Sequence, residues 1–381
     1  MELTAIDLFA GAGGLSEGFK NAGFKILAAN DFDEFSAQTF KVTHPDTFFL
    51  DGPIQDIDAQ DFLNVTNLQH GDLDCLVGGP PCQAFSVYNH QRGMHDERSG
   101  LFREYLRIVE GLFPKYVVIE NVTGMTSVAN GQAIKEITRG LFALGYFNIE
   151  SRILKAEEFG VPQERRRIVI IANRIANPIT WPKPLHNISN FTTVKDAISD
   201  LPEIENGQGT DYGVNYKIPF DQASNFQKTM RKKSIFITNH EAPKLSEINL
   251  KRMHYVPQGG SWRDIPYELL PTGMKRAKRS DHTKRYGRLK ETGLSSTILT
   301  KCDIHWGTFY HPTQERSITV REAARLQSFP DHYIFQGPRT EQYRQVGNAV
   351  PPLLAEVIAI EIKKQLTFTQ LNANRSSQYH L

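Results

Sequence analysis

The first candidate for chemistry is a single cysteine in an unusual backbone setting. Cys82 follows the apolar run 73–77, inside the segment Gly78-Gly79-Pro80-Pro81-Cys82-Gln83-Ala84-Phe85-Ser86. Two glycines and two prolines restrict the path of the backbone there, which suits the positioning of a nucleophile and is not needed for a structural cysteine. Cys75 lies inside the apolar run and is predicted to be a small core residue. We therefore predict that Cys82 is a catalytic nucleophile.

An acidic residue occupies the corresponding place after a second apolar run. Glu120 follows the run 116–119 and begins the triplet Glu120-Asn121-Val122. A charged group at the end of a buried strand is costly, so a functional reason for it is favoured. If the strands at 73–77 and 116–119 are neighbours, Cys82 and Glu120 face each other at the edge of the sheet where open α/β folds bind ligands. They would then act as nucleophile and acid.

Three consecutive arginines precede a later apolar run, in the segment Gln163-Glu164-Arg165-Arg166-Arg167. Strand alternation would direct Arg165 and Arg167 to one side and Arg166 to the other. Two convergent guanidinium groups could orient Glu120 or bind a phosphate or carbonyl oxygen. The alternative is a basic strand entry on the protein surface.

A glycine-rich turn near the N-terminus is the first candidate for cofactor binding. The segment Phe9-Ala10-Gly11-Ala12-Gly13-Gly14 joins a strand to a helix. Glycine tolerates positive φ and lets the backbone approach a ligand, and the helix N-terminus presents free N–H groups. A Rossmann dinucleotide site looks similar, but the third glycine of that motif is missing here. A tight turn without a ligand is the plain alternative.

Two acidic positions follow the glycine turn. Asp31 comes after the second strand, about 20 residues past the turn, where an acid in a βαβ unit commonly holds ribose hydroxyls. Phe32, beside it, could stack on an adenine ring, and Asp56, followed by Ile57, could accept a hydrogen bond from the adenine amino group. The alternative for each acid is a helix N-cap or a solvated loop residue.

The elements that must position these residues alternate between strands and helices, which predicts an α/β domain with a largely parallel sheet. The pattern changes after about residue 182, where a polar and basic region with little periodicity begins. Helical character resumes at 319–328 and 352–365. The predicted strands are 5–9, 24–29, 73–77, 116–119 and 167–172, and the predicted helices of the first part are 14–22, 101–113 and 133–144.

Composition narrows the classes of function. The net charge is only +2, yet residues 228–290 hold 16 Lys and Arg against 5 Asp and Glu, which predicts a face for a polyanion or else a solvated lysine-rich surface. Three cysteines without a CxxC pair support neither a disulfide framework nor a zinc site. The N-terminus lacks the pattern of a signal peptide, and no apolar stretch is long enough to span a membrane. We expect an intracellular protein without bound metal.

Taken in order, the motifs resemble those of the cytosine-5 DNA methyltransferases, especially the bacterial restriction–modification type. The resemblance covers nearly the full chain. One departure is Asp31, where the family usually has glutamate. The matching segments are Phe9–Gly13, Pro80–Cys82, Glu120–Val122, Gln163–Arg167, Arg321–Pro330 and Gly347–Val350.

The resemblance implies a doubly wound, Rossmann-like domain that binds S-adenosylmethionine, formed by residues 1–182 and 317–365. It implies a smaller target-recognition domain at 183–316, followed by a polar tail at 366–381 that we expect to be frayed. It further implies a monomer in the bacterial cytoplasm, associated with the nucleoid, that acts on double-stranded DNA and flips one cytosine out of the helix. The implied catalytic residues are Cys82, Glu120, Arg165 and Arg167, with Arg165 at the carbonyl side of the ring. The implied cofactor contacts are Phe9, Gly11, Gly13, Asp31, Phe32, Asp56, Ile57, Pro80, Leu101 and Asn348, and the implied DNA contacts are Gln83, Ser86, Arg98 and Thr297.

Three other functions are compatible with parts of this pattern. A transfer-RNA cytosine methyltransferase would share Cys82 and Glu120, although the long basic segment favours DNA. A catalytically silent DNA-binding regulator would not need the intact set of catalytic residues. A nicotinamide-dependent oxidoreductase is suggested by the glycine turn alone. Neither the recognised DNA sequence nor the base-reading residues follow from the sequence, although Arg263, Lys275 and Arg279 are candidates.

Overall fold

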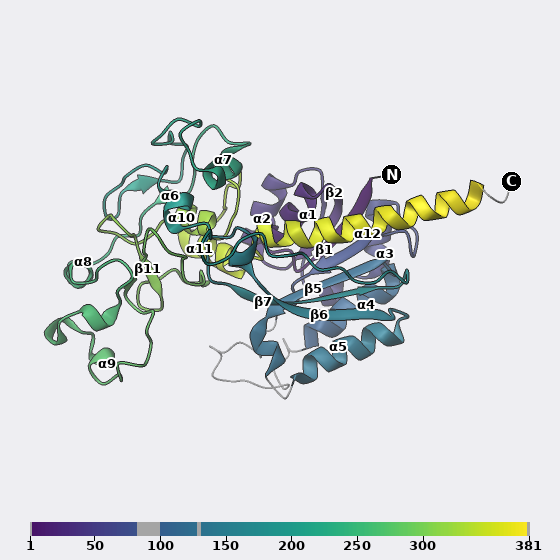
Figure 1. Cartoon of the computed structure of the whole chain (residues 1–381), viewed down its shortest axis with the longest axis horizontal. Helices are drawn as coiled ribbons and strands as arrows, with labels where there is room; N and C mark the ends of the chain where they lie inside the picture. Colours follow the sequence, from purple (N-terminus) through teal and green to yellow (C-terminus); the bar gives the residue numbers. More distant parts are fainter. Residues whose placement is uncertain (1, 82–99, 128–130, 379–381) are drawn as a thin grey trace. The chain divides into compact units, whose positions relative to one another are not determined.

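The structure is a computed structural model that describes residues 2–81, 100–127 and 131–378 (Figure 1). The chain forms two compact units. The first unit consists of Met1–Lys155, Arg166–Pro184 and Val350–Leu381, and the second consists of Ala156–Arg165 and Leu185–Ala349.

The first unit contains a seven-stranded sheet in the order β3-β2-β1-β4-β5-β7-β6. Pairing is parallel from β3 to β5, whereas β7 is antiparallel to both β5 and β6. This is the doubly wound, mostly parallel α/β fold that the sequence predicts. The strands are β1 (Leu3–Leu8), β2 (Phe24–Asp31), β3 (Phe48–Asp51), β4 (Cys75–Gly78), β5 (Tyr116–Val122), β6 (Asn148–Lys155) and β7 (Arg166–Asn173).

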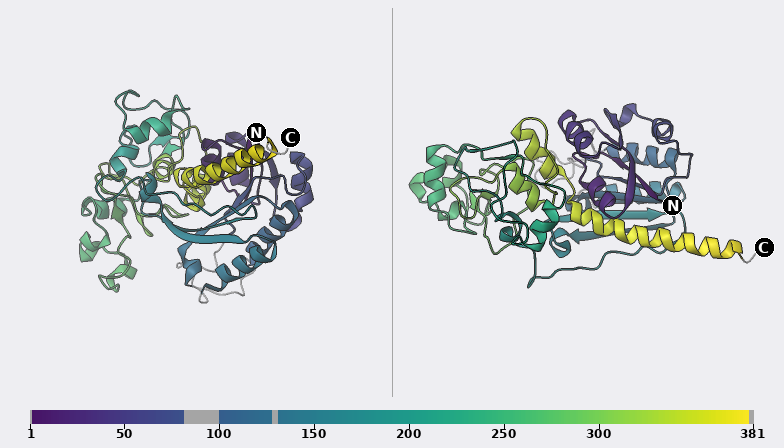
Figure 2. Two further views of the ribbon diagram at one scale, coloured as in Figure 1. Left: turned by 45° about the vertical axis from the view of Figure 1, so that its right-hand side comes forward. Right: turned by 90° about the horizontal axis from the view of Figure 1, so that it is seen from above.

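Helices cover both faces of this sheet (Figure 2). Alternate strand residues such as Ile6, Leu8 and Ile119 point into one large apolar core with α3, α4 and α5. On the opposite face, α1 packs along α12. The helices of this unit are α1 (Gly14–Asn21), α2 (Glu34–Thr43), α3 (Ala59–Thr66), α4 (Leu101–Leu112), α5 (Gln132–Ala143) and α12 (Pro352–Gln378).

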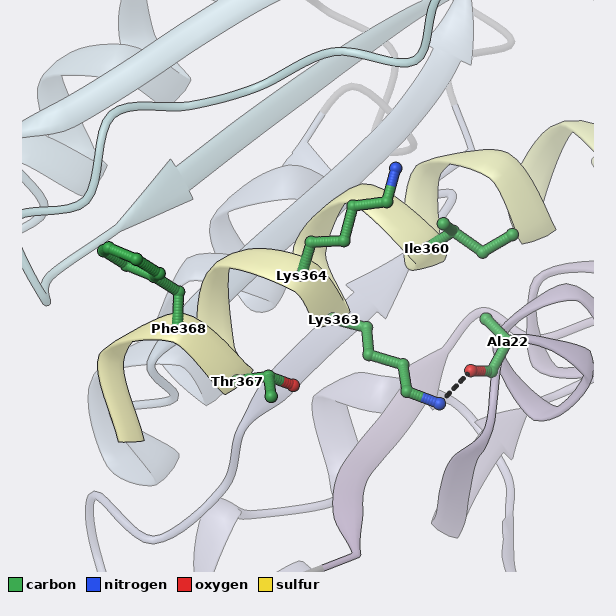
Figure 3. Close-up of a pocket in the computed structure, with 6 residues that line it drawn as sticks. All are labelled: Ala22, Ile360, Lys363, Lys364, Thr367 and Phe368. Atoms are coloured by element: carbon green, nitrogen blue, oxygen red, sulfur yellow. Dashed lines mark hydrogen bonds between the residues drawn. The ribbon is translucent and has the colours of Figure 1, made fainter. Parts of the chain in front are cut away.

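The C-terminal helix α12 is longer than the sequence predicts, because it continues from Gln365 to Gln378 through the segment expected to be a frayed tail. It is anchored where Lys363 Nζ donates a hydrogen bond of 2.8 Å to the carbonyl oxygen of Ala22, just past the end of α1. The two helices border the shallow pocket shown in Figure 3. None of the predicted cofactor contacts lines this pocket, which therefore gives no support for a ligand site there.

The second unit consists mainly of short elements and loops, with two pairs of two-residue or three-residue strands. No helix among the described residues is long and apolar enough to cross a membrane. The elements of this unit are α6 (Val194–Ile198), β8 (Gly209–Thr210), α7 (Asn225–Arg231), β9 (His240–Glu241), α8 (Glu247–His254), α9 (Thr272–Lys275), β10 (Gly287–Arg288), β11 (Thr308–Tyr310), α10 (Val320–Leu326) and α11 (Arg339–Asn348).

A buried network of ion pairs organises the second unit around α10. Arg325 contacts Asp331 at 2.5 Å and Asp200 at 3.1 Å, and all three side chains are fully buried. Glu322, on the same helix as Arg325, pairs at 2.7 Å with Arg316, which precedes the helix. These contacts place residues 317–349 in the second unit. The sequence had instead predicted that the chain returns to the first unit at residue 317; the return occurs at Val350.

The buried side chain of His311 should make this unit sensitive to acid. Its Nδ1 accepts hydrogen bonds from the backbone N–H groups of Thr313 and Gln314, so the ring is neutral. Burial lowers the pKa of His311 to about 4, and nearby Arg316 adds to this effect while Glu322 opposes it. The unfolded chain therefore takes up a proton between about pH 6.5 and pH 4 that the folded chain resists, and folding stability falls as pH falls through this window.

We expect the variant His311→Asn to lose part of this dependence, because the amide oxygen can replace Nδ1 as acceptor without binding a proton. In the wild type, protonation of this histidine in the unfolded chain should lower the free energy of unfolding by about 3 kcal/mol between pH 6.5 and pH 4. Urea denaturation at several pH values in this range measures the slope of the free energy of unfolding against pH. The exposed His254 provides the control His254→Asn, which should keep the wild-type slope. Equal slopes in all three proteins would contradict the prediction.

Candidate active site

The two strands that precede the predicted nucleophile and acid are direct neighbours. β4 pairs with β5 in parallel, with Cys75 opposite Tyr116 and Gly78 opposite Ile119. Glu120 therefore follows directly beside Gly79, at the carboxyl edge of the sheet. The adjacency that the sequence predictions required is confirmed. Cys82 itself lies outside the described residues, as do Gln83, Ser86 and Arg98.

Space excludes a side chain at the first of the two glycines before the prolines and is tight at the second. A Cβ on Gly78 would lie 2.6 Å from the carbonyl oxygen of Leu8 and 2.8 Å from the ring of Tyr105. A Cβ on Gly79 would lie 3.3 Å from Oε2 of Glu120. The backbone that leads to Cys82 thus passes close to the Glu120 carboxyl group. A side chain at Gly78 would shift this backbone, and a side chain at Gly79 would crowd the carboxyl group.

Glu120 forms an ion pair with Arg167. Arg167 Nε lies 2.8 Å from Glu120 Oε1, and the two side chains are 13% and 10% exposed. The pair arises because β5 and β7 are antiparallel neighbours. Burial lowers the pKa of Arg167, and the Glu120 carboxylate opposes that shift. Of the three consecutive arginines, Arg167 is the one that pairs with Glu120. Its role in orienting the acid stays a prediction.

Asn121 connects β5 to the segment that carries the nucleophile. Its Nδ2 donates a hydrogen bond of 2.9 Å to the carbonyl oxygen of the buried Pro80. Its Oδ1 accepts from the N–H of Val122 at 2.8 Å. Asn121 was not among the predicted site residues, although it stands inside the triplet Glu120–Val122. An asparagine at this place in the sequence could equally well support a neighbouring backbone segment or contact a ligand.

Arg165 has a different environment from the one the sequence predicts for it. β7 begins at Arg166, so strand alternation does not extend to Arg165. Its guanidinium is buried in the second unit and donates to the carbonyl oxygens of Ile298, Gly347 and Ala349 at 3.3, 3.0 and 2.9 Å. It therefore holds two backbone segments of that unit together, one at Ile298 and one at Gly347 and Ala349. Arg165 and Arg167 therefore do not converge through strand alternation, and the arginine paired with Glu120 is Arg167. The role of Arg165 at the carbonyl side of the ring stays a prediction.

Two further predicted contacts also lie in the second unit. The Thr297 hydroxyl donates a hydrogen bond of 2.7 Å to the backbone carbonyl oxygen of Glu164. A hydrogen bond from this hydroxyl to a phosphate would require that bond to open. Asn348 is the exposed last residue of α11. Next to it, a Cβ on Gly347 would lie 2.4 Å from the backbone of Leu299, which explains the glycine.

The glycine turn after β1 has the left-handed conformation that glycine favours. Gly11 and Gly13 have φ of 55° and 89°, and Phe9 also has a positive φ of 56°. A Cβ on Gly13 would clash with His44 at 2.8 Å, whereas one on Gly11 would meet no described atom within 4 Å. Gly13 is thus required by packing, and Gly11 borders open space where a ligand could approach the backbone.

Asp31 holds the turn from the neighbouring strand. Its Oδ2 accepts from the N–H of Gly11 and its Oδ1 from the N–H of Asp33, both at 2.8 Å. A carboxylate has about four acceptor positions, so about two remain for ribose hydroxyls. Burial raises the pKa of Asp31, and the two backbone N–H groups oppose that shift. Beside it, Phe32 is 68% exposed and available for stacking.

The remaining predicted cofactor contacts lie on the edge defined by these strands. Asn30, which was not predicted, donates to the carbonyl oxygens of Leu50 and Gly52 and so fixes the end of β3. The short 3₁₀ helix Ile54–Asp56 follows, with Asp56 exposed and Ile57 buried. Leu101 is the first residue of α4 and is partly buried.

Asp7 lies below the glycine turn and was also missed. Its Oδ2 accepts from the N–H and the hydroxyl of Ser16 at 3.1 and 2.7 Å, while its fully buried Oδ1 has no hydrogen-bond partner among the described residues. Burial raises the pKa of Asp7 to about 7, and the bonds from Ser16 oppose the shift. An acidic residue near the end of a predicted strand was the available signal in the sequence. In the structure, however, the Asp7 side chain faces α1 and not the carboxyl edge of the sheet.

These residues fit an adenosyl cofactor. Gly11 leaves room at the backbone, Asp31 keeps free acceptor positions, and Phe32 offers an exposed ring. A carboxylate acceptor and an aromatic face suit ribose and adenine, respectively. No cluster of three or more His, Cys, Asp or Glu suitable for a metal ion occurs in the described part of the chain.

Comparisons with known proteins agree with this arrangement. The model of the family described as C-5 cytosine-specific DNA methylase matches residues 3–364. The chain is 35% identical over 369 residues to Type II methyltransferase M1.HphI of Haemophilus parahaemolyticus, covering 96% of this chain and 88% of that protein. It is 34% identical over 379 residues to Type II methyltransferase M.DdeI of Desulfomicrobium norvegicum, covering 94% and 88%, respectively.

Solved structures show the same fold. A prophage-encoded Escherichia coli protein, described as a candidate DNA modification methyltransferase, matches with a TM-score of 0.77 and 25% identity, covering 96% of this chain and 99% of that one. A variant of Spodoptera frugiperda DNMT2 matches with a TM-score of 0.59 and 16% identity, covering 95% and 99%. At that identity the second likeness concerns the fold alone.

Proposed function

We propose, from the premise that this chain belongs to the C-5 cytosine-specific DNA methylases, that it transfers a methyl group from S-adenosylmethionine to a cytosine within a specific duplex sequence. As a C-5 cytosine-specific enzyme it acts at carbon-5 of the base. Similarity to Type II methyltransferases supports a role as the modification enzyme of a restriction–modification system. The observation that carries the mechanism is the buried Glu120–Arg167 pair beside Gly79 and Pro80, immediately before Cys82.

Carbon-5 of cytosine is a poor nucleophile, and a covalent step makes it reactive. The Cys82 thiolate adds to carbon-6, which forms an S–C bond, breaks the aromaticity of the ring and places electron density on carbon-5. The addition makes ring N3 more basic, so a proton passes to N3 through the Glu120 carboxyl group. Arg167 stabilises the carboxylate that remains.

The remaining steps restore the ring. S-adenosylmethionine supplies an electrophilic methyl group on a positively charged sulfur. Carbon-5 would take this methyl group as the methyl–sulfur bond breaks, which leaves S-adenosylhomocysteine. Water would then accept the carbon-5 proton, the Cys82 thiolate would leave carbon-6, and the proton on N3 would return through Glu120. Gly11, Asp31 and Phe32 would hold the cofactor, with Phe9, Gly13, Asp56, Ile57, Pro80, Leu101 and Asn348 as further proposed contacts.

The cytosine must leave the stacked duplex for this chemistry, so we propose that it is flipped. On the basis of the sequence alone, we propose that DNA is contacted by Gln83, Ser86 and Arg98. Thr297 is proposed to contact a phosphate near the flipped nucleotide. The basic region 228–290 supports a DNA-binding face in the second unit, where Arg263, Lys275 and Arg279 are exposed.

Bisulfite sequencing of host DNA after expression of the chain tests the proposal, because it reports the reaction, the methylated position and the sequence together. We expect complete conversion resistance at cytosines of one short motif and background levels elsewhere. Parallel assays of purified protein on duplex DNA and on transfer RNA separate the two substrates. Methylation of transfer RNA alone, or binding of NAD in place of S-adenosylhomocysteine, would overturn the proposal.

Asn121 is proposed to position Cys82, and its replacement tests this. In Asn121→Ala the carbonyl oxygen of Pro80 loses its donor, so the nucleophile should be displaced. Because displacements of about 1 Å can cost about 100-fold, we expect the single-turnover rate to fall roughly 10- to 100-fold with unchanged cofactor affinity. The exposed Asn64 on α3 provides the control Asn64→Ala. An unchanged rate in Asn121→Ala would show that the bond to Pro80 does not matter.

A further inference from the structure

An exposed tryptophan in the second unit is paired with an arginine. The side chain of Trp306 is 55% exposed, whereas Trp181 and Trp262, the two other tryptophans of the chain, are 8% and 3% exposed. The guanidinium carbon of Arg285 lies 4.6 Å from the centroid of the Trp306 ring. Such cation–aromatic contacts keep a planar ring and a positive charge side by side at the surface.

The backbone fixes this pair in place. The N–H of Tyr286 donates to the carbonyl oxygen of Ile304 at 2.7 Å, and that of Gly287 donates to Gly307 at 3.2 Å. These bonds lead into the parallel pairing of β10 with β11. Arg285 and Trp306 thus stand at the same end of the two strands. We refer to Lys284, Arg285 and Trp306 together as the Trp306 platform.

The charge around the platform is suited to a polyanion. Lys284 makes one ion pair, with Glu164 at 3.7 Å, and both side chains are 61% exposed. Exposed pairs of this kind contribute little and exchange readily for another anion. Asp303, which precedes Trp306 in the same turn, is paired with His305. A flat aromatic surface flanked by cations is typical of sites that contact both the bases and the phosphates of nucleic acids.

The chain also connects the platform to the active site. Glu164, the partner of Lys284, lies three residues before Arg167 in the sequence, and Arg167 pairs with Glu120. The backbone carbonyl oxygen of Glu164 also accepts a hydrogen bond from the Thr297 hydroxyl. The platform therefore belongs to the part of the second unit from which the chain passes directly to the catalytic residues.

We propose that the Trp306 platform binds duplex DNA, with Arg285 and Lys284 on backbone phosphates and the Trp306 ring against an exposed base or sugar. The inference rests on the proposed function, because it takes DNA as the substrate. It adds a contact that lies outside the motifs shared with the family.

Tryptophan fluorescence gives a readout that does not depend on activity. Bisulfite sequencing first identifies the methylated motif, and a duplex oligonucleotide carrying that motif is then titrated into the full-length protein. Because Trp306 is the exposed tryptophan, we expect quenching and a shift of the emission on binding. The variant Trp306→Phe should bind with an affinity near that of the wild type but lose most of the signal.

Affinity measurements complete the test. Trp306→Ala should weaken duplex binding by roughly 5- to 100-fold, as for the loss of one stacked base. Arg285→Gln should lower the slope of log affinity against log salt by about 1. The control Phe147→Ala removes an aromatic ring that is 72% exposed and is paired with Phe142 rather than with a cation, so it should bind as the wild type does.

The outcomes separate this inference from the proposed function. If the wild type methylates the motif but its fluorescence does not respond to the duplex and Trp306→Ala binds normally, the platform proposal is wrong while the proposed function stands. An equal loss of affinity in Phe147→Ala also counts against the platform. If the wild type methylates no DNA, the proposed function fails, and the platform proposal fails with it.

Discussion

Replacement of Cys82 by serine is expected to lower the rate of methylation by about 10⁴-fold or more, because a serine hydroxyl is hardly ionised at neutral pH and adds poorly to a pyrimidine ring. Binding of S-adenosylhomocysteine and of duplex DNA should remain close to the wild type, since neither depends on the thiolate. Single-turnover assays with a labelled methyl donor measure the rate.

The covalent step has its own signature. Duplex DNA with 5-fluorocytosine at the target position should trap the wild type as an adduct that withstands denaturation, because fluorine at carbon-5 cannot leave as a proton. Cys82→Ser should give no adduct. Cys302 provides the matched control, since burial raises its pKa and makes its thiol unreactive, so Cys302→Ala should still be trapped. Turnover by Cys82→Ser at a rate comparable to the wild type would refute the mechanism.

Replacement of Glu120 by glutamine should have the second largest effect. The amide cannot pass a proton to ring N3, and general acid catalysis contributes about 10²- to 10⁴-fold, so we expect a loss of that size in the single-turnover rate. The variant also leaves the buried Arg167 without its anionic partner, which should lower the melting temperature. The rate and the melting temperature are therefore measured together.

A comparison between variants separates catalysis from folding. Glu110 on α4 is exposed, and Glu110→Gln should match the wild type in both measurements. Arg167→Gln breaks the same ion pair but keeps the carboxyl group, so its rate should fall less than that of Glu120→Gln. A rate in Glu120→Gln equal to that of Arg167→Gln would mean that the carboxyl group acts only as the partner of the arginine.

Local patterns in the sequence were sufficient for the main elements of the first unit. The apolar runs at 24–29 and 116–119 became β2 and β5, and the apolar spacing at 101–113 became α4, because each element buries a face whose period is visible in the sequence. Glycine and proline marked the segment before Cys82, since these residues restrict or free the backbone locally.

Support residues could not be recognised in the same way. Asn121, Asn30 and Asp7 act through hydrogen bonds to backbone groups that are 9 to 41 residues away in the sequence. A polar residue beside a strand end has the same local signal whether it supports a neighbouring segment or is merely solvated. Only the folded chain shows which backbone group it meets.

The sequence by itself determined the family, the likeness of the catalytic motifs and the succession of strands and helices, because these depend on residue type and short-range periodicity. The tertiary structure decided which arginine serves Glu120. β7 lies antiparallel beside β5 and begins at Arg166, so Arg167 meets the carboxylate, while Arg165 is held by carbonyl oxygens of the second unit. It also decided that residues 317–349 belong to that unit, where the buried Arg325 of α10 pairs with Asp200, a residue far away in the sequence.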